Sequence, residues 1–248
     1  MTRTKKILGR TLAIVLSVLV LATVAFLFYS SMVMRGDRAA AIEVWTNDDL
    51  VVTSTDHSIV IAPATDPSGA GLVFIPGAKV DPYAYLYKLS GIVEETGATV
   101  VITKPILNLA FFDQRPLSTF TDDAPTVERW FVGGHSLGGV RACQWAEGTD
   151  VAGLVLFGSY CSNDLSDTGL QVLSISGSED GLSTPQKIDS AASLLPEGTD
   201  FVEIQGLNHA GFGDYGVQPG DGRSSLTGAE ARDEITAALT HVLARNPR

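Results

Sequence analysis

One short turn limits the fold of this chain more than any other part of its sequence. Residues 134–139, Gly-His-Ser-Leu-Gly-Gly, follow the apolar run 130–132 and precede a helical pattern over residues 140–147. A strand, a tight turn centred on a serine and a helix, in that order, predict a nucleophile elbow. We expect a strained backbone at Ser136, and side chains at Gly134 or Gly138 would collide with the neighbouring strand or helix.

The elbow would hold the Ser136 hydroxyl above the edge of a sheet. The following helix begins with free N–H groups and the positive end of its dipole, which stabilise an oxyanion forming beside the serine. The N–H of Leu137 is therefore an expected oxyanion donor. Because the chain has 25 glycines, the Gly-x-Ser-x-Gly pattern alone is weak evidence, and the prediction depends on the strand-turn-helix context.

The remaining sequence predicts an α/β fold, with a mostly parallel sheet and helices on both faces. From residue 71 onward, short apolar runs alternate with helical patterns. The expected strands are residues 72–75, 99–102, 130–132, 151–157, 170–175 and 201–204. The expected helices begin at Asp81-Pro82, after the elbow, at Thr184-Pro185 and at the capping box 227–230. Residues 42–62 are expected to add one or two edge strands.

The loop after the strand at 72–75 is a candidate part of the site, because ligands of an open α/β sheet bind beyond the carboxyl ends of its strands. This loop reads Pro76-Gly77-Ala78-Lys79. A glycine there allows a sharp turn that aims the next N–H back toward the elbow and supplies a second oxyanion donor. We expect Ala78 to be that donor, with Lys79 as the alternative.

A serine nucleophile also needs an imidazole base and a carboxylate that fixes the tautomer of the imidazole. Asp180 lies in the loop after the strand at 170–175, and its Asp-Gly step leaves room for a short carboxylate to fold inward. Glu179, beside it, and Asp164, after the previous strand, are the alternative acids.

Elimination among the four histidines selects the base. His209 alone follows the final strand, in the loop 206–211. His57 lies in the N-terminal strand region and His241 on the last helix. His135 neighbours the nucleophile, where its side chain is expected to point to the opposite side of the turn.

The chain order Ser136, Asp180, His209 is the order of an α/β-hydrolase triad. Over about residues 50–245 the sequence resembles the α/β-hydrolase superfamily, in a small lid-poor bacterial subgroup similar to dienelactone hydrolases. The segments that carry the resemblance are 74–82, 134–139, 177–181 and 208–216. The resemblance implies carboxyl-ester hydrolysis by these three residues. Dienelactone hydrolases have a cysteine nucleophile, so the serine here does not imply their cyclic enol-lactone substrates.

A lid is nearly missing from the sequence. Most members of the superfamily insert one where this chain has only residues 158–169. We therefore expect an open pocket, walled by residues 108–116 and 160–164. So few residues cannot build a deep apolar tunnel, and a buried methylene adds about 0.8 kcal/mol of binding only where there is wall to bury it against. The predicted substrates are small-molecule esters of short or water-soluble acyl groups.

The predicted mechanism needs no cofactor and no metal ion, since a serine triad supplies nucleophile, base and acid itself. The Gly- and Asp-rich segment 213–222 is expected to form another wall of the pocket. A cation held through Asp214 and Asp221 is the alternative, although the segment lacks the spacing of a calcium loop.

The N-terminus predicts a membrane anchor. Residues 11–34 are free of charge, and as a helix they would reach about 36 Å, enough to cross a hydrocarbon core of about 30 Å. Four basic residues precede the run, so residues 1–10 are expected in the cytoplasm and the rest outside. A signal peptide cleaved near residues 23–25 is the alternative. We predict a single-pass signal anchor, a linker at 35–41 and a hydrolase domain at 42–248.

Charge excludes one class of partner. Without residues 1–38 the chain keeps 11 basic and 27 acidic residues, a net charge of −16, which repels nucleic acid and anionic lipid surfaces. We therefore expect a domain tethered near the bilayer but not lying in it. Its two cysteines, Cys143 and Cys161, fall on the exported side, where thiols tend to oxidise, and the sequence leaves their pairing open.

The predicted function is thus that of a membrane-anchored extracytoplasmic serine hydrolase acting on esters through an acyl-enzyme. Acyl transfer to an alcohol or sugar by the same triad is a second hypothesis. A non-catalytic surface binding domain on the same fold is a third, and labelling of Ser136 by a fluorophosphonate separates it from the other two. The oligomeric state cannot be predicted.

Overall fold

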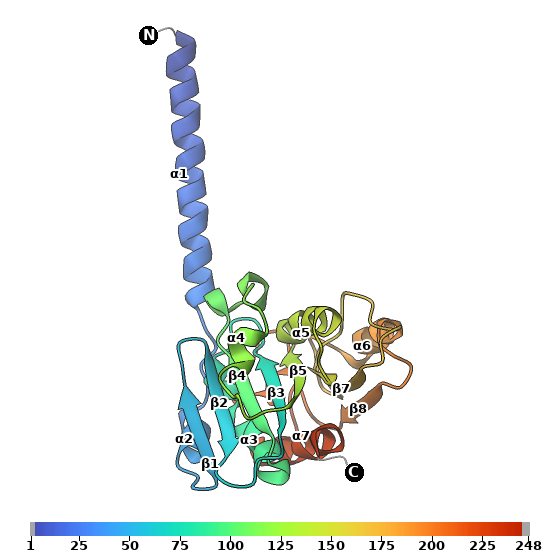
Figure 1. The fold of residues 1–248 in the computed structure, drawn as a ribbon. Coiled ribbons are helices and arrows are strands. Elements are labelled where there is room, and N and C mark those ends of the chain that lie inside the picture. Colours follow the sequence, from blue (N-terminus) through green and yellow to red (C-terminus); the bar gives the residue numbers. More distant parts are fainter. Residues whose placement is uncertain (1–2, 245–248) are drawn as a thin grey trace.

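A sheet of eight strands forms the centre of the computed structural model, which describes residues 3–244 (Figure 1). The outer ends of the predicted segments, 1–2 and 245–248, lie outside the described residues. The strands are β1 (Leu50–Ser54), β2 (Ser58–Pro63), β3 (Ala70–Ile75), β4 (Thr99–Thr103), β5 (Arg129–His135), β6 (Gly153–Phe157), β7 (Gln171–Gly177) and β8 (Asp200–Ile204). Their order in the sheet is β1-β2-β4-β3-β5-β6-β7-β8.

The pairing confirms the predicted fold class. β1 and β2 are antiparallel to their neighbours, and the strands from β4 to β8 along the sheet run parallel. Every residue of β3, β4 and β6 is buried, as expected for short apolar runs in a sheet that is covered on both faces. The carboxyl ends of the parallel strands therefore share one edge, and the candidate loops lie there.

Different helices cover the two faces. The long helices are α1 (Arg3–Ser31), α2 (Arg38–Trp45), α3 (Leu86–Thr96), α5 (Leu137–Gly148) and α7 (Gly228–Leu243), and the short ones are α4 (Ser118–Thr121) and α6 (Pro185–Ala191). Short 3-10 turns occupy Pro82–Tyr85, Ile106–Asn108, Ala110–Phe112, Ala192–Leu194 and His209–Phe212. Leu72 and Phe74 of β3 pack in one core with α3 and α7, whereas Val73 packs in the other with α5. This alternation follows the two-residue period of a strand.

The N-terminal helix α1 projects from the carboxyl edge of the sheet (Figure 1). Residues Lys5–Ser31 are long and apolar enough to cross a membrane, and the most hydrophobic window of this stretch is not buried against the domain. The predicted apolar run extended to residue 34, but the helix ends at Ser31. Met34 instead forms a short parallel bridge with Val80, because its N–H donates to the Lys79 carbonyl (2.7 Å) and its carbonyl accepts the Asp81 N–H (2.9 Å).

The segment 35–41, predicted as a linker, is built into the domain. Its Asp37 carboxylate accepts the N–H groups of Ala39 and Ala40 and caps α2, which begins at Arg38. The Asp37 N–H donates to the Asp214 carbonyl. Residues 42–45 therefore belong to a helix, and the two edge strands start only at Leu50. Aspartate is a common N-cap residue, but the apolar run that precedes Asp37 favoured a linker at this position.

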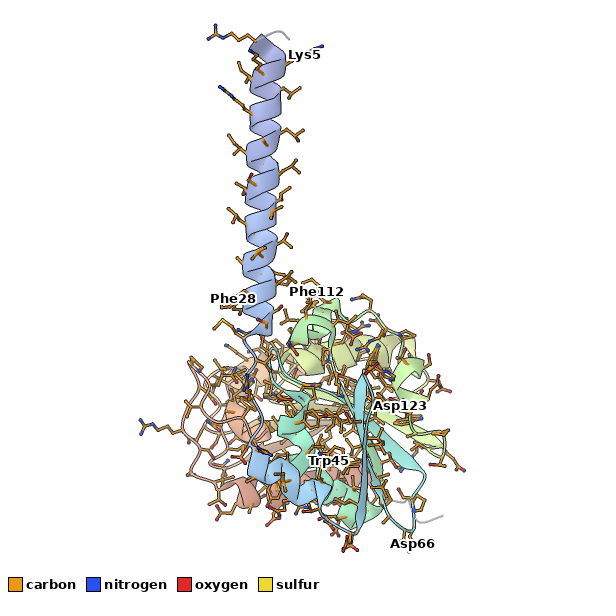
Figure 2. All side chains as sticks on the ribbon, turned by 90° about the vertical axis from the view of Figure 1, so that its left-hand side faces the viewer. Lys5, Phe28, Trp45, Asp66, Phe112 and Asp123 are labelled. Carbon is orange, nitrogen blue, oxygen red and sulfur yellow. A yellow bond between two sulfur atoms is a disulfide. The ribbon has the colours of Figure 1, made fainter. Side chains whose placement is uncertain are left out.

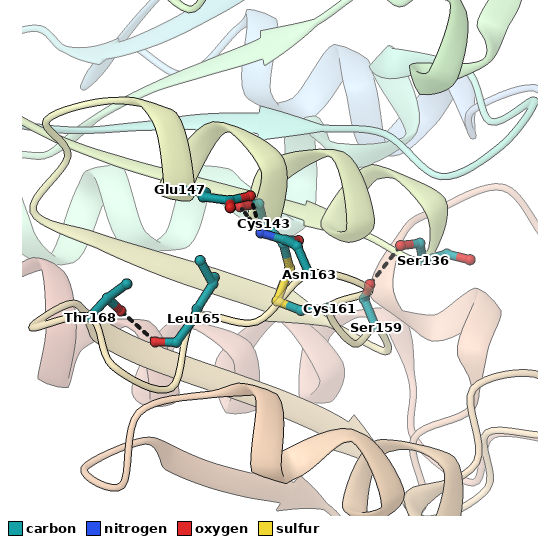
Figure 3. The surroundings of a disulfide bond; sticks show 8 residues. All are labelled: Ser136, Cys143, Glu147, Ser159, Cys161, Asn163, Leu165 and Thr168. Carbon is teal, nitrogen blue, oxygen red and sulfur yellow. Dashed lines mark hydrogen bonds between the residues drawn. A yellow bond between two sulfur atoms is a disulfide. The ribbon is translucent and has the colours of Figure 1, made fainter.

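Cys143 and Cys161 form a disulfide, with Cα atoms 5.6 Å apart (Figure 3). The bond ties α5 to residues 158–170, the segment between β6 and β7 that stands where a lid would be. None of these residues belongs to a helix or strand. The Asn163 side chain strengthens this attachment, since its amide donates to the Cys143 carbonyl (3.2 Å) and to the Glu147 carboxylate (2.9 Å). The segment is thus held against the elbow helix and does not cover the edge as a separate lid.

Candidate active site

The turn at Ser136 has the conformation of a nucleophile elbow. β5 ends at His135, α5 begins at Leu137, and Ser136 between them has φ 53° and ψ −122°, which confirms the predicted strain. A Cβ atom at position 138 would lie 2.1 Å from the Ile75 carbonyl oxygen, and one at position 134 would lie 2.5 Å from the backbone of α5. Only glycine fits at either position, as the sequence predicted.

Two backbone N–H groups beside the elbow are free to bind an oxyanion. Among the described residues, neither the Ala78 N–H nor the Leu137 N–H donates a hydrogen bond, and both residues are half-buried. The Lys79 N–H, the alternative donor, is bonded to the Asn108 carbonyl (2.8 Å). Lys79 also has a positive φ of 56°, which turns the chain sharply after Ala78. The geometry favours Ala78 over Lys79.

Asp180 and His209 form a buried pair at the same edge. His209 Nδ1 lies 2.7 Å from Asp180 Oδ2, and the two residues are 1% and 3% exposed. The other oxygen, Oδ1, accepts the N–H groups of Leu182 (2.8 Å) and Ser183 (2.7 Å). Such an acceptor fixes the proton on Nδ1 and leaves Nε2 as the free base.

The segment after β6 brings this pair to the elbow. The Ser159 hydroxyl donates to the Ser136 carbonyl (2.7 Å; Figure 3), and the preceding Gly158 lies against both Asp180 and His209. A Cβ atom on Gly158 would lie 2.9 Å from Asp180 Oδ2 and 3.2 Å from His209 Nδ1. A side chain at position 158 would therefore press on the pair, and its positive φ of 48° also favours glycine.

The alternative acids and bases lie elsewhere. Asp164 and Glu179 are exposed, and hydrogen bonds from the hydroxyl and the N–H of Ser166 lower the pKa of the Asp164 carboxyl. His57 Nε2 lies 3.0 Å from Asp123 Oδ2, on the β2 side of the sheet, and His241 is exposed on α7. In the part of the chain that the structure describes, Asp180 is the carboxylate that pairs with the His209 ring.

Asp221 supports the pair, and sequence reasoning assigned it a different role. Its carboxylate accepts the backbone N–H groups of His209 (3.1 Å), Ala210 (2.8 Å) and Gly181 (3.1 Å). It thus joins the loop that carries His209 to the loop that carries Asp180. The sequence indicated Asp221 only through its place in the Gly- and Asp-rich segment 213–222, which was expected to form a pocket wall or to hold a cation.

Both acidic residues of that segment have partners within the domain. Asp221 is used by backbone donors, and the Asp214 carboxylate is paired with the buried Lys88 ammonium. Burial raises the pKa of Asp214, against the opposing effect of Lys88. No group of three or more His, Cys, Asp or Glu side chains able to hold a metal ion occurs among the residues that the structure describes.

His135 lies against His209, a contact that the sequence did not predict. The two ring centroids are 4.4 Å apart, and His135 Nδ1 lies 2.8 Å from the Tyr85 hydroxyl. That hydroxyl also accepts the Gly77 N–H (3.0 Å). Burial and the neighbouring His209 lower the pKa of His135 well below its usual value, while burial raises that of Tyr85. A neutral His135 thus links the oxyanion loop to the base.

The lowered pKa of His135 predicts acid sensitivity. Above pH about 6.5 the residue is neutral in both folded and unfolded chains, and below it the unfolded chain binds a proton that the folded one refuses. Stability is therefore lost as the pH falls below about 6.5. We expect His135→Gln to reduce the loss of unfolding free energy between pH 8 and pH 5 by roughly 2 kcal/mol at most, measured by denaturant titration in detergent. Equal losses in both proteins would contradict this assignment.

Parts of the two expected walls contact the loop after β3 and the elbow helix. Asn108 contacts Lys79 next to the proposed oxyanion donor, and residues 160–164 continue from Ser159 and include the disulfide. Ser136 is half-buried. The elbow, the Asp180–His209 pair and the two N–H groups thus lie at the same edge of the sheet, as attack of a serine on an acyl carbonyl requires.

Comparison with known proteins agrees with this architecture. The profile of the alpha/beta hydrolase family matches residues 71–233. A serine hydrolase without a lid from Xanthomonas campestris has a TM-score of 0.55 at 14% identity, over 81% of this chain and 98% of that one. A serine hydrolase homologue from Coxiella burnetii gives 0.54 at 10%, over 79% and 98%. Est1E from Butyrivibrio proteoclasticus gives 0.54 at 10%, over 78% and 98%. No curated protein matches the sequence.

At these identities the structural likenesses bear on the fold alone, and the family follows from the sequence profile. That profile spans β3 to the first half of α7, and it includes the elbow, the Asp180 loop and the His209 loop. The protein is a member of the α/β hydrolase family.

Proposed function

We propose that the protein is a membrane-anchored, extracytoplasmic serine hydrolase that cleaves carboxylic esters of short or water-soluble acyl groups. Ser136 is the nucleophile, His209 the base and Asp180 the acid that orients it, with the N–H groups of Ala78 and Leu137 as the oxyanion hole. The observation that carries the proposal is the buried 2.7 Å contact of Asp180 with His209, next to a serine held at φ 53°.

The reaction follows from this arrangement. The Ser136 hydroxyl oxygen attacks the acyl carbonyl carbon while His209 Nε2 takes its proton. The Ala78 and Leu137 N–H groups stabilise the oxyanion that forms. Asp180 holds the Nδ1 proton and stabilises the imidazolium, which then protonates the leaving alcohol. Water, deprotonated by His209, attacks the acyl-enzyme in the same way and releases the acid.

A fluorophosphonate probe tests this assignment. With the full chain in detergent, we expect covalent labelling at Ser136, located by mass spectrometry of the peptide, and none in Ser136→Ala. A folded protein that stays unlabelled would favour a binding domain. Adding a second alcohol during ester turnover separates hydrolysis from acyl transfer, because a transferase would form a new ester instead of the free acid.

The length of the acyl chain gives a second test. Residues 158–170 are few and held to α5 by the disulfide, so they provide little wall for a long chain. Each further methylene adds about 0.8 kcal/mol of binding only where wall is available. We expect kcat/KM for p-nitrophenyl esters from acetate to palmitate to peak at about two to six carbons. A rise that continues to ten carbons or beyond would contradict the proposal.

The anchor and its orientation have their own test. The stretch Lys5–Ser31 passes the length and hydropathy requirements for a span, and four basic residues, the last of them Arg10, precede its uncharged part. We expect protease added to intact cells to remove the domain. Protection of the domain would reverse the orientation, and a mature chain starting near Phe26 would identify a cleaved signal peptide.

A further inference from the structure

An uncharged, apolar loop stands exposed at the carboxyl edge of the sheet. Residues 106–112, Ile-Leu-Asn-Leu-Ala-Phe-Phe, contain no charge, and the side chains of Ile106, Phe111 and Phe112 are 46%, 55% and 48% exposed. Scattered apolar side chains on a surface are ordinary, but three large ones within seven residues mark a surface that meets another apolar phase. The catalytic steps assign no role to these side chains, although Phe111 and Phe112 belong to the expected pocket wall 108–116.

The loop is packed on the end of α1. The Phe112 ring contacts the Phe26 ring, with centroids 5.4 Å apart, and the Asn108 amide donates to the Ser30 carbonyl (3.1 Å). Figure 2 shows Phe112 beside the lower end of α1, whose side chains above that point stand clear of the domain. The Lys79 ammonium lies 3.7 Å from the centre of the Tyr29 ring. The loop and the helix end therefore form one surface.

The length of α1 fixes the depth of this surface in a bilayer. Arg10 is the last basic residue before the apolar run, and a core of about 30 Å needs about 20 helical residues, which places the outer boundary near Ser30. Phe26 then lies about 6 Å inside that boundary. The Phe112 ring contacts Phe26 and therefore also lies close to this boundary. Tyr29 and the neighbouring Lys79 would lie in the headgroup region just outside the core, where tyrosine and lysine are common.

We propose that residues 106–112 are seated in the outer interface of the bilayer that α1 spans, so that the edge of the sheet bearing Ser136 faces the membrane surface. This inference rests on the anchoring part of the proposed function. It also brings the active site close to lipid, because the Asn108 carbonyl accepts the N–H of Lys79, the neighbour of Ala78.

The acidity of the domain does not oppose this seating. The segments around the loop and the helix end, residues 29–38, 77–82 and 104–116, hold five basic and three acidic residues, so the net charge of −16 is carried elsewhere. Within the loop's own flank, Asp113 is buried and paired with Arg115. The expectation of a domain held off the bilayer treated the charge as evenly spread, whereas the segments beside the anchor carry a small positive excess.

A lipid-depth measurement on the full chain tests the proposal. Since Cys143 and Cys161 are paired, a cysteine introduced at position 111 or 106 is the reactive thiol for an environment-sensitive fluorophore. The labelled protein is placed in phosphatidylcholine nanodiscs with and without lipid that carries a nitroxide near the top of its acyl chain. We expect blue-shifted emission and about twofold quenching for Phe111→Cys and Ile106→Cys, because interfacial side chains lie at the headgroup–acyl boundary.

Phe201→Cys is the matched control. Phe201 is 49% exposed, but it lies near the start of β8 and so at the opposite edge of the sheet, where we expect no quenching. Equal quenching at 201 and 111, or none at both 106 and 111, overturns the seating while the anchor stands. Release of the unlabelled protein from membranes by alkaline carbonate overturns the anchor itself. Ester hydrolysis by the same sample reports on the catalytic proposal separately.

Discussion

Ser136→Ala and His209→Ala are each expected to lower kcat/KM for a short ester by roughly three to six orders of magnitude, because the members of a triad act as a unit. For the same reason the double variant should be little worse than either single one. The measurement is p-nitrophenyl acetate hydrolysis by the full chain in detergent, with thermal unfolding as the check that each variant folds.

The matched carboxylate variants test the assignment of the acid. Asp180→Asn removes the charge beside His209 Nδ1, and the asparagine amide favours the wrong tautomer of the imidazole. We therefore expect kcat to fall by roughly four orders of magnitude. Asp164→Asn should keep near-full activity, since the Asp164 carboxylate is exposed and is hydrogen-bonded to Ser166. The reverse pattern, with Asp164 essential and Asp180 dispensable, would contradict the proposed acid.

Removing residues 1–39 is expected to cost about ten- to a hundredfold in kcat, although this cut leaves the sheet intact. Met34 pairs through its backbone with Lys79 and Asp81, directly after the proposed donor Ala78. Without that bridge the oxyanion loop loses a neighbour that fixes its position. A chain beginning at residue 30 keeps the bridge and should retain most of the activity. The comparison uses kcat and KM for a short ester in the same detergent.

A point substitution in the full chain isolates the bridge from the loss of the anchor. Met34→Pro removes the N–H that donates to the Lys79 carbonyl, and Met34→Ala keeps it. We expect the proline variant to lose kcat as the shortened chain does, and the alanine variant to keep it. Equal activity of the two variants would show that the side chain or the anchor matters instead of the backbone bridge.

Local sequence determined the fold class and the backbone of the elbow. Apolar runs that alternate with helical patterns leave a parallel sheet with two covered faces as the way to bury both kinds of element. The glycine at 134 is required by the backbone of the following helix, close by in the chain, whereas the glycine at 138 is required by a distant segment, the end of β3 at Ile75 and the following Pro76. The Thr227–Glu230 capping box is equally local and begins α7 as predicted.

The order of Asp180 and His209 in the chain was also readable, because strand ends of a parallel sheet converge on one edge. Whether either carboxylate of the Glu179-Asp180 pair faces the histidine depends on the backbone conformation of that loop. The fold turns Asp180 inward, where three donors hold it, and leaves Glu179 exposed. The Asp221 carboxylate accepts the N–H of Gly181, 40 residues earlier in the chain. No local sequence pattern can indicate such a contact.

Contacts between distant segments were decided by the tertiary structure alone. Pairing of Cys143 with Cys161 requires a Cα separation that only the packing of α5 on the following loop creates. Hydropathy identified residues 11–34 as an apolar run. It could not show that the helix ends at Ser31 and that Met34 pairs with Val80 in the loop after β3. The net charge of the sequence likewise does not show which surface of the folded domain carries the acidic residues. The sequence indicated the candidate reactive residues and their order along the chain, because those signals are local. Tertiary packing determined which of them meet and which edge the anchor leaves from, because backbone hydrogen bonds between remote loops leave no periodic trace in the sequence.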